Sequence, residues 1–268
     1  MQKFGYVLSG GGARGFAHLG LLKYLEELHI RPAAIAGTSA GAIVGALYAA
    51  GNTPEEILKL MKENSLFGLG NISWTKPGFF SMEILKKVLK NAVEKDDFDA
   101  LKIPLFVAAT DLNKGEAVIF SKGELFRPVI ASASVPVVFE PVIIGDKMLV
   151  DGGLMNNFPV EPLEDICDVI IGSYVNSMED CIGDKTAFRT FNILDRCFHL
   201  AIASSVYSKV DKCDVFVEAP LYAFDMFDIK AADKIFEIGY NTAMKHKEEL
   251  ERLVKTASIS DLPNQFCI

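Results

Sequence analysis

The sequence predicts an α/β fold in which helices cover both faces of a largely parallel sheet. Short apolar runs typical of strands alternate along the chain with stretches of helical periodicity. Half of the 268 residues are apolar and the mean hydropathy is +0.25, which suits a sheet buried on both faces. No linker, internal repeat or low-complexity block divides the chain, so we expect one domain over residues 1–268.

Two strand–turn–helix units open the chain. In the first, an apolar strand leads through a glycine-rich turn into a helix with leucines at three-residue steps. In the second, an apolar strand and an apolar helix flank a sharp turn, and Gly51 closes the helix. Thr53 and Pro54 suit the N-cap and first position of a third helix. The expected bounds are 3–9, 10–15 and 16–29 for the first unit, 33–36 and 40–50 for the second, and 53–64 for the third helix.

The same alternation continues through the rest of the chain. A hairpin turns at 113–115, Pro136 stops a short helix, and two short strands flank a Gly145-Asp146 turn before Asp151. The expected strands lie over 103–110, 117–120, 142–144, 148–150, 168–175 and 215–218. The expected helices lie over 81–93, 128–134, about 187–209 and about 229–255, with a loose tail over 256–268.

Composition restricts the classes of function and location. The net charge of −8 and the pI of about 5.1 argue against general nucleic-acid binding and against bulk attraction to anionic lipid. Five cysteines without a C-x-x-C pair indicate the reduced thiols of a cytosolic protein. The N-terminus runs directly into a glycine motif, so we expect no signal peptide. Residues 33–50 carry no charge, but a buried strand, turn and helix explain them better than a membrane span.

The sharp turn of the second unit reads Gly37-Thr-Ser-Ala-Gly41, a G-x-S-x-G pattern that puts Ser39 forward as a nucleophile. A serine at the apex of a strand-to-helix turn leaves almost no room for side chains two residues before and after it. The following helix directs its N–H groups and positive dipole end towards charge that develops near Ser39. Because small-residue turns are common, the pattern needs partners elsewhere in the chain.

The glycine-rich turn, Gly10-Gly-Gly-Ala-Arg-Gly15, follows a strand and opens a helix, so its N–H groups can line an anion site. Three interpretations remain open from the residues alone: a dinucleotide-phosphate turn, an oxyanion hole for acyl transfer, or a plain helix start. The first lacks the acidic residue expected about 20 positions later, because residues 32–38 contain no Asp or Glu.

The third motif, Asp151-Gly152-Gly153, follows the second short hairpin. It suits the exit turn of that hairpin. It also suits a general base for Ser39, since glycines beside a carboxylate allow another backbone to approach closely.

No histidine has an obvious place in a Ser-His-Asp triad. His18 and His29 lie on the first helix, His246 lies in a charged surface run, and His199 lies mid-helix between apolar neighbours. A Ser–Asp dyad is more economical. Because aspartate is a weak base, the dyad would need a close, poorly solvated contact and strong oxyanion stabilisation.

In combination these motifs resemble the patatin-like phospholipase family. The resemblance rests on 10–15, 37–41 and 151–153 in that order and covers roughly residues 3–250. It extends to Ala109-Thr-Asp-Leu112, Ala131-Ser-Ala-Ser-Val-Pro136 and Asn157-Phe-Pro159. It implies a three-layer α/β/α sandwich with a mainly parallel central sheet, and hydrolysis of fatty acyl esters of phospholipids or lysophospholipids without a metal or other cofactor.

The resemblance also implies roles for individual residues. Ser39 would be the nucleophile and Asp151 the base, with the amides of Gly10, Gly11 and Gly12 as the oxyanion hole. Arg14 matches the arginine of the motif, and we expect it to order the glycine loop or nearby carbonyl groups. The third motif ends in Gly where many members have Ala.

The sequence leaves alternatives open for how the substrate reaches the site and for which molecule accepts the acyl group. Residues 65–81 are too apolar for a free loop and either pack on the core or form a lid, an acyl-binding wall or a membrane-touching patch. The expected partners are a lipid or fatty acyl ester and, transiently, a membrane surface, with a cytoplasmic location. The alternatives to a hydrolase are an acyltransferase with the same acyl-enzyme and a non-catalytic lipid-sensing module.

Overall fold

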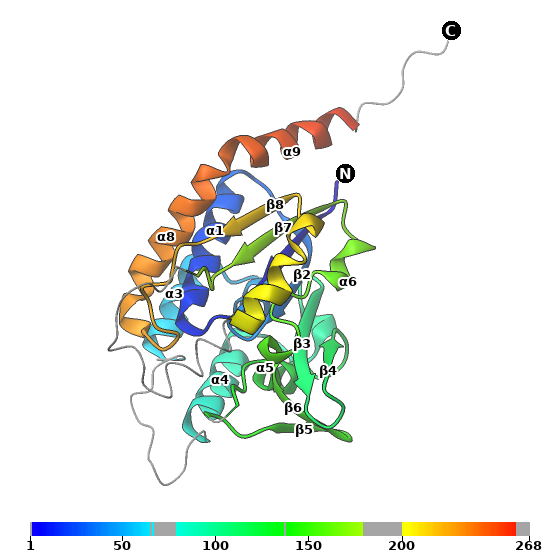
Figure 1. Cartoon of the computed structure of the whole chain (residues 1–268), viewed down its shortest axis with the longest axis vertical. Helices are drawn as coiled ribbons and strands as arrows, with labels where there is room; N and C mark the ends of the chain where they lie inside the picture. The colour runs from blue at the N-terminus through cyan, green and yellow to red at the C-terminus, as the bar shows by residue number, and fades with distance from the viewer. Residues whose placement is uncertain (1, 65, 67–78, 137, 179–199, 261–268) are drawn as a thin grey trace.

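An eight-stranded sheet formed by the described residues runs through the middle of the molecule (Figure 1). This computed structural model describes residues 2–64, 66, 79–136, 138–178 and 200–260, with 79–81 and 255–260 described as backbone alone. The strands are β1 (Phe4–Leu8), β2 (Pro32–Thr38), β3 (Leu105–Asp111), β4 (Glu116–Phe120), β5 (Val142–Ile144), β6 (Lys147–Asp151), β7 (Val169–Tyr174) and β8 (Val215–Glu218).

The strand order is β5-β6-β3-β2-β1-β7-β8, with β4 also paired to β3. Pairing is parallel from β3 through β2, β1 and β7 to β8, and antiparallel where β3 meets β4 and β6 and where β5 meets β6. The register pairs Leu8 with Gly37, Thr38 with Ala108, and Ala109 with Asp151. The three motifs lie at the C-terminal ends of β1, β2 and β6. The pairing therefore brings the three motifs close together in space.

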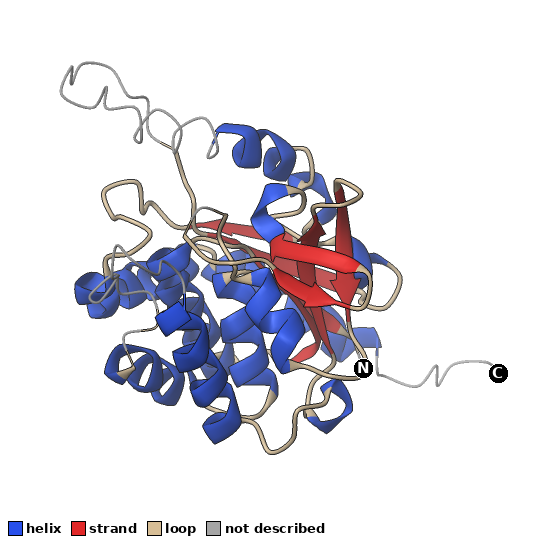
Figure 2. Cartoon of the chain, turned by 90° about the horizontal axis from the view of Figure 1, so that it is seen from below, coloured by secondary structure: helices blue, strands red, loops and turns tan. Residues whose placement is uncertain are grey.

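Helices cover both faces of the sheet, most of them on one side (Figure 2). The larger core lies under α1, α2, α3, α4, α5, α8 and α9, and the smaller core lies under α6 and the helical residues 200–207. Adjacent strand residues alternate between the two cores, as Tyr6 and Val7 do. The helix bounds are Phe16–Glu27 (α1), Ala40–Ala49 (α2), Pro54–Glu63 (α3), Phe79–Ala92 (α4), Phe126–Ser132 (α5), Glu161–Glu164 (α6), Ala232–Lys245 (α8) and Lys247–Ser260 (α9).

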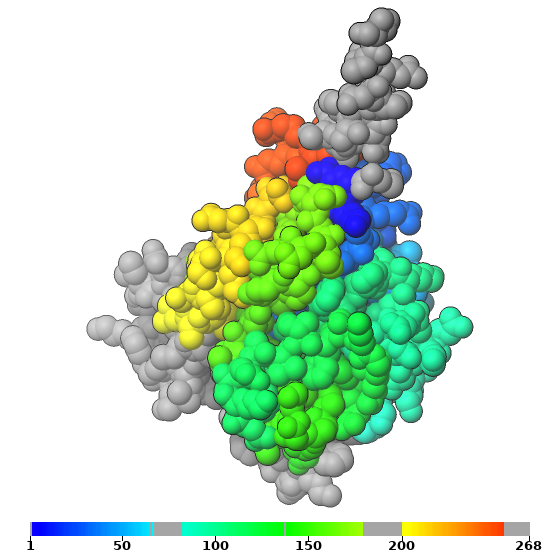
Figure 3. All heavy atoms as spheres, turned by 90° about the vertical axis from the view of Figure 1, so that its right-hand side faces the viewer, coloured from blue at the N-terminus to red at the C-terminus, as the bar shows by residue number. Residues whose placement is uncertain are grey.

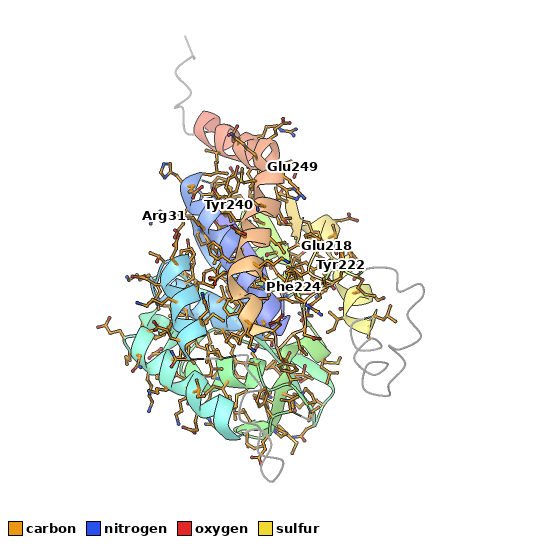
Figure 4. All side chains as sticks on the ribbon, turned by 90° about the vertical axis from the view of Figure 1, so that its left-hand side faces the viewer. Arg31, Glu218, Tyr222, Phe224, Tyr240 and Glu249 are labelled. Carbon is orange, nitrogen blue, oxygen red and sulfur yellow. The ribbon has the colours of Figure 1, made fainter. Side chains whose placement is uncertain are left out.

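This arrangement confirms the predicted fold class, a three-layer α/β/α sandwich with a mainly parallel central sheet. Helix α8 packs along α1, where the rings of Tyr24 and Tyr240 meet edge to face at 5.6 Å and the Tyr240 hydroxyl donates to Glu27 at 2.7 Å (Figure 4). The helices on this face of the sheet are therefore joined by contacts between segments far apart in the sequence.

Two local predictions are confirmed. Thr53 caps α3 in a capping box: its hydroxyl accepts the N–H of Glu56 at 3.3 Å, and the Glu56 carboxylate accepts the N–H of Thr53 at 2.8 Å. The uncharged residues 33–50 form the end of β2, a turn and α2. Within the described ranges, no helix is both long and apolar enough to cross a bilayer.

The C-terminal helix differs from the prediction. Instead of one helix over about 229–255, α8 ends at Lys245 and α9 begins at Lys247. At the break, the N–H of His246 donates to Ala243, three residues back, and its ring contacts Glu249 at 2.8 Å. Because α9 continues to Ser260, the prediction of a loose tail from 256 is wrong for 256–260, and 261–268 lie outside the described residues.

Candidate active site

Ser39 lies at the apex of the turn between β2 and α2. Its φ is 51° and its ψ is −118°, a conformation that non-glycine residues rarely adopt. Only 7% of Ser39 is exposed, and it occupies the N-cap position of α2. The turn therefore has the strained strand-to-helix geometry that the G-x-S-x-G pattern predicts.

The two flanking glycines are required by backbone packing. A Cβ on Gly37 would lie 2.5 Å from the carbonyl oxygen of Gly41, and a Cβ on Gly41 would collide with the carbonyl group of Leu8 on β1. Both obstacles are backbone atoms, which cannot rotate away. The motif needs glycine at both positions because α2 passes very close to the ends of β1 and β2.

Replacing Gly41 with alanine is expected to destabilise the protein by about 2–4 kcal/mol, as overpacking against fixed backbone does. Gly45, one turn further along α2, is the matched control, because its Cβ would meet only side-chain atoms of Leu105 and Ile35 at 3.0 and 3.2 Å. Gly45→Ala is expected to change stability by less than about 1 kcal/mol. Urea denaturation of both variants measures the difference, and equal midpoints would contradict it.

Asp151 ends β6 beside the serine. Its carboxylate accepts a hydrogen bond from the N–H of Gly153 at 2.7 Å, and both Ser39 and Asp151 line the same pocket. Its backbone is held at both ends, since its N–H donates to the carbonyl of Ser134 at 2.9 Å and its carbonyl accepts the Thr110 hydroxyl at 2.9 Å. Burial raises the pKa of Asp151 from 3.8 to about 6, against the opposing effects of the Ser39 side chain and the Gly153 N–H, which both favour the ionised carboxylate.

The glycine loop lines the same pocket as Ser39 and Asp151. Gly11 and Gly12 line the pocket, and no hydrogen bond from their N–H groups is made to a described residue. Gly10 differs from the prediction, because its N–H donates to the carbonyl of Asn157 at 3.2 Å. Gly12 has a φ of 58°, and a Cβ there would collide with the carbonyl of Met226. The predicted oxyanion hole therefore narrows from three amides to those of Gly11 and Gly12.

Arg14 supports the glycine loop through a chain of hydrogen bonds. Its Nε donates to the carbonyl of Phe224 at 2.8 Å, and an Nη donates to the Oδ1 of Asn176 at 3.2 Å. The Nδ2 of Asn176 in turn donates to the carbonyl of Gly10 at 2.7 Å. Figure 4 shows Phe224 beside α8. These contacts fit the expectation that Arg14 orders the glycine loop.

A pocket of about 340 Å³, partly open to solvent, lies between the three motifs. Its apolar lining comes from Val135, Ile202 and Met226, and its polar lining includes Asn157 and Asn176. The full lining in the described part of the chain is Gly10, Gly11, Gly12, Ser39, Val135, Asp151, Gly153, Asn157, Asn176, Ile202 and Met226.

Asn156 links the serine turn to the aspartate loop and to Lys209 in the turn that follows the helical segment 200–207. Its carbonyl accepts the Thr38 hydroxyl at 2.8 Å, and its N–H donates to Gly152 at 2.8 Å. Its side chain bonds to Lys209 at 2.8 Å and Glu161 at 3.0 Å, which themselves pair at 2.6 Å. The loop is thereby tied to the segment that supplies Ile202 to the pocket.

His18 is a structural residue. It is fully buried, and its two ring nitrogens bond to the carbonyl of Ser9 at 2.9 Å and to the hydroxyl of Ser173 at 2.7 Å. Because a carbonyl can only accept, Nε2 carries the proton and Nδ1 accepts the Ser173 hydroxyl. Burial lowers the pKa of His18 to about 4, so the ring is neutral near pH 7.

Among the described residues, no histidine lines the pocket. His29 lies beyond α1 with a φ of 58°, and His246 lies between α8 and α9. His199 lies outside the described residues, as does most of the segment 65–81, of which Leu66 is described and buried. Within the same ranges, no cluster of three His, Cys, Asp or Glu side chains offers a set of metal ligands. Cys167 and Cys213 are free thiols.

Sequence reasoning missed several residues of the site. Asn176 follows β7 and could have been found from the rule that sites of parallel sheets lie at the carboxyl ends of strands. Asn157 and Ser132 lie in the Asn-Phe-Pro and Ala-Ser-Ala-Ser-Val-Pro segments, which the resemblance marked without assigning them roles.

Comparison with known proteins decides the family. The model of the family described as patatin-like phospholipase matches residues 6–164, more than half of the chain. The chain belongs to the patatin-like phospholipase family. The three motifs that line the pocket all lie within the matched range.

Relatives of this patatin-like protein include much longer chains. An uncharacterized NTE family protein of Mycobacterium tuberculosis is 32% identical over 176 residues, 65% of this chain and 49% of that protein. Lysophospholipase NTE1 of Cryptococcus neoformans is 30% identical over 287 residues, 92% of this chain and 17% of that protein. The chain thus spans about half of the first relative's length and under a fifth of the second's.

The patatin-like fold is also found in a solved structure. VipD from Legionella pneumophila superposes with a TM-score of 0.55 over 94% of this chain and 67% of that one, at 16% identity. At that identity the likeness concerns the fold alone.

Proposed function

We propose that the protein is a serine lipid acyl hydrolase that cleaves fatty acyl esters of phospholipids or lysophospholipids. The observation that carries this proposal is the meeting of Ser39 and the buried Asp151 carboxylate in one pocket, which is also lined by Gly11 and Gly12, two residues whose backbone amides have no described partner. Membership of the patatin-like phospholipase family and the similarity to a lysophospholipase support a lipid ester as the substrate.

The chemistry proceeds in two halves. The Ser39 oxygen attacks the ester carbonyl while Asp151 takes its proton, and the amides of Gly11 and Gly12 stabilise the oxyanion. The tetrahedral intermediate collapses, the ester C–O bond breaks, and the leaving alcohol takes the proton from Asp151. Water then attacks the acyl-enzyme, again giving a proton to Asp151, and the fatty acid leaves as Ser39 recovers that proton.

The pKa of Asp151 suits this role. A carboxylate with a pKa of about 6 is a stronger base than an ordinary aspartate and is still ionised near pH 7. An aspartate that acts as the base without a histidine needs a poorly solvated site that raises its pKa, and the burial of Asp151 provides such a site. Arg14 and Asn176 keep the glycine loop in place.

The rate on a soluble, non-ionising ester is expected to depend on pH through this carboxyl. Below about pH 6, kcat/KM should fall roughly tenfold per pH unit, because protonated Asp151 cannot accept the Ser39 proton. Above about pH 7 the profile should be flat. Initial rates from pH 4.5 to 8.5 test this, and a rate independent of pH between 5 and 7 would contradict a role for Asp151 as base.

We further propose a cytoplasmic enzyme that touches membranes transiently near the site. Leu154 and Met155, just beyond Asp151, are 42% and 46% exposed. Residues 105–155 and 200–207 share one face of the molecule (Figure 3). Exposed apolar side chains beside a lipid site favour contact with a bilayer.

Met155→Glu is expected to slow hydrolysis of phosphatidylcholine vesicles severalfold while leaving the rate on a soluble short-chain ester unchanged, because a buried charge opposes contact with lipid. Met244→Glu on α8 is the matched control, since Met244 is also 46% exposed and lies outside the pocket lining. Equal loss in both variants, or loss on the soluble ester, would contradict membrane contact through Met155.

Hydrolysis of a lipid panel by the native protein and the Ser39→Ala variant tests the proposed function. Fatty acid should be released from phospholipid or lysophospholipid by the native protein alone, and His199→Ala should retain most of the activity. Transfer of the acyl group to an added alcohol instead of water would favour an acyltransferase. Lipid binding without any product would favour a lipid-sensing module.

A further inference from the structure

The pairing of β2 with β3 ends where the nucleophile begins. The parallel register runs from Ile35 opposite Leu105 to Thr38 opposite Ala108. In such a ladder the next hydrogen bond would join the N–H of Ser39 to the carbonyl of Ala108. That direct bond is replaced by a side chain.

The Ser132 hydroxyl stands between these two backbone groups. Its Oγ accepts the N–H of Ser39 at 2.8 Å and donates to the carbonyl of Ala108 at 2.6 Å. A hydroxyl has one proton, and here it points at Ala108, so its lone pairs are left for Ser39. Ser132 is fully buried, as is the Ala108 carbonyl it serves, so no water competes for either bond.

This insertion explains how the chain leaves the sheet at the catalytic turn. A direct ladder bond would hold Ser39 in the extended conformation of β2, whereas its φ is 51°. With one oxygen atom placed between the strands, both buried backbone groups keep a partner while Ser39 moves out of the sheet. The strained conformation is thereby held by contacts around it.

The same segment also holds the base. Two residues after Ser132, the carbonyl of Ser134 accepts the N–H of Asp151 at 2.9 Å. The end of α5 therefore binds the backbone N–H groups of both Ser39 and Asp151, which come from strands on opposite sides of β3. These two bonds set how far apart the nucleophile and the base lie.

We propose that Ser132 is a positioning residue, whose hydroxyl keeps the Ser39 oxygen aimed at Asp151; this rests on the proposed function. It touches no substrate and lies outside the pocket lining. The Ser132 hydroxyl acts only through the backbone of Ser39. Removing this hydroxyl should therefore lower the reactivity of Ser39 strongly and the affinity for substrate only slightly.

The test compares Ser132→Ala with Thr242→Val. The Thr242 hydroxyl is also buried but donates to the carbonyl of Ile238 on its own helix, α8, at 2.7 Å, and Thr242 lies outside the pocket lining. Ser132→Ala should lower kcat and the rate of phosphonylation by a fluorophosphonate about 10- to 100-fold with KM nearly unchanged. Ser132→Thr, which keeps the hydroxyl, should restore most of the rate, and Thr242→Val should stay within about threefold of native.

Two further measurements keep the test decisive. If Ser132→Ala does not fold, Ser132→Cys replaces it, because a thiol keeps the volume and bonds weakly; it should be folded and slow. Amide hydrogen exchange at Ser39, followed by NMR, should accelerate in the hydroxyl-free variant even if the protein hydrolyses no ester, which separates failure of this proposal from failure of the proposed function. Native exchange and native phosphonylation in Ser132→Ala would overturn the positioning role, as would an equal loss in Thr242→Val.

Discussion

Ser39→Ala is expected to lower ester hydrolysis by at least about 10⁴-fold, because alanine has no hydroxyl with which to form the acyl-enzyme. The fold should be retained, since alanine removes only the hydroxyl and the backbone of residue 39 keeps its bond to Ser132. Release of fatty acid and of a chromogenic alcohol from a short ester both measure the loss. Ser208→Ala is the control, because the Ser208 hydroxyl is exposed and bonds only to Ser205.

Residual activity in Ser39→Ala close to the native value would place the nucleophile elsewhere. If a variant lost activity and also melted at a lower temperature, the loss could come from unfolding instead of from the missing hydroxyl. The thermal midpoint is therefore measured for each variant. The expected result is a native midpoint and no turnover.

Asp151→Asn is expected to lower the rate by about 10³- to 10⁴-fold and, at the same time, to stabilise the protein at neutral pH. The rate falls because an amide cannot take the serine proton. The stability rises because the native carboxylate is ionised in a buried site, and an amide of the same shape removes that charge. Opposite changes in activity and stability from one substitution are typical of a functional residue that the fold tolerates.

The sign and size of the stability change follow from the pKa values. The pKa of Asp151 is about 6 in the folded protein and about 3.8 in the unfolded chain. A raised folded-state pKa favours the folded protein fully below pH 3.8, and this contribution is lost as the pH rises through 6. The native protein should therefore lose about 2–3 kcal/mol relative to Asp151→Asn between pH 4 and pH 8.

Comparison with the variant removes a contribution of opposite sign from His18. Its pKa is lowered to about 4, so acid destabilises the folded state of both proteins as the pH falls from 6.5. Urea denaturation at pH 4, 6 and 8 gives the difference between native and variant at each pH. A difference that does not change with pH would show that Asp151 is not a buried ionising group.

Much of the site could be predicted from short patterns because its chemistry lies in contiguous motifs. Gly37 and Gly41 predict a sharp turn, and the structure shows the backbone contacts that leave no room for a Cβ at either position. Thr53 and Glu56 predict a helix start, because a capping box is formed within four consecutive residues. The lack of a suitable histidine directed attention to Asp151, which lines the same pocket as Ser39.

The remaining features depend on contacts between distant segments. The N–H of Gly10 is used by Asn157, 147 positions later in the numbering, and no local pattern in the glycine motif reveals it. The support of Ser39 by Ser132 spans 93 positions and requires the register of β2 and β3. The break at His246 was missed because helical periodicity continues through it.

The most direct test of the Ser39–Asp151 pair is the site and rate of covalent modification by a fluorophosphonate. Mass spectrometry of the digested protein should locate a single adduct on Ser39. The adduct should be absent from Ser39→Ala, and it should form at least about 100-fold more slowly in Asp151→Asn. An adduct on another residue, or an unchanged rate in Asp151→Asn, would contradict a nucleophile at Ser39 activated by Asp151.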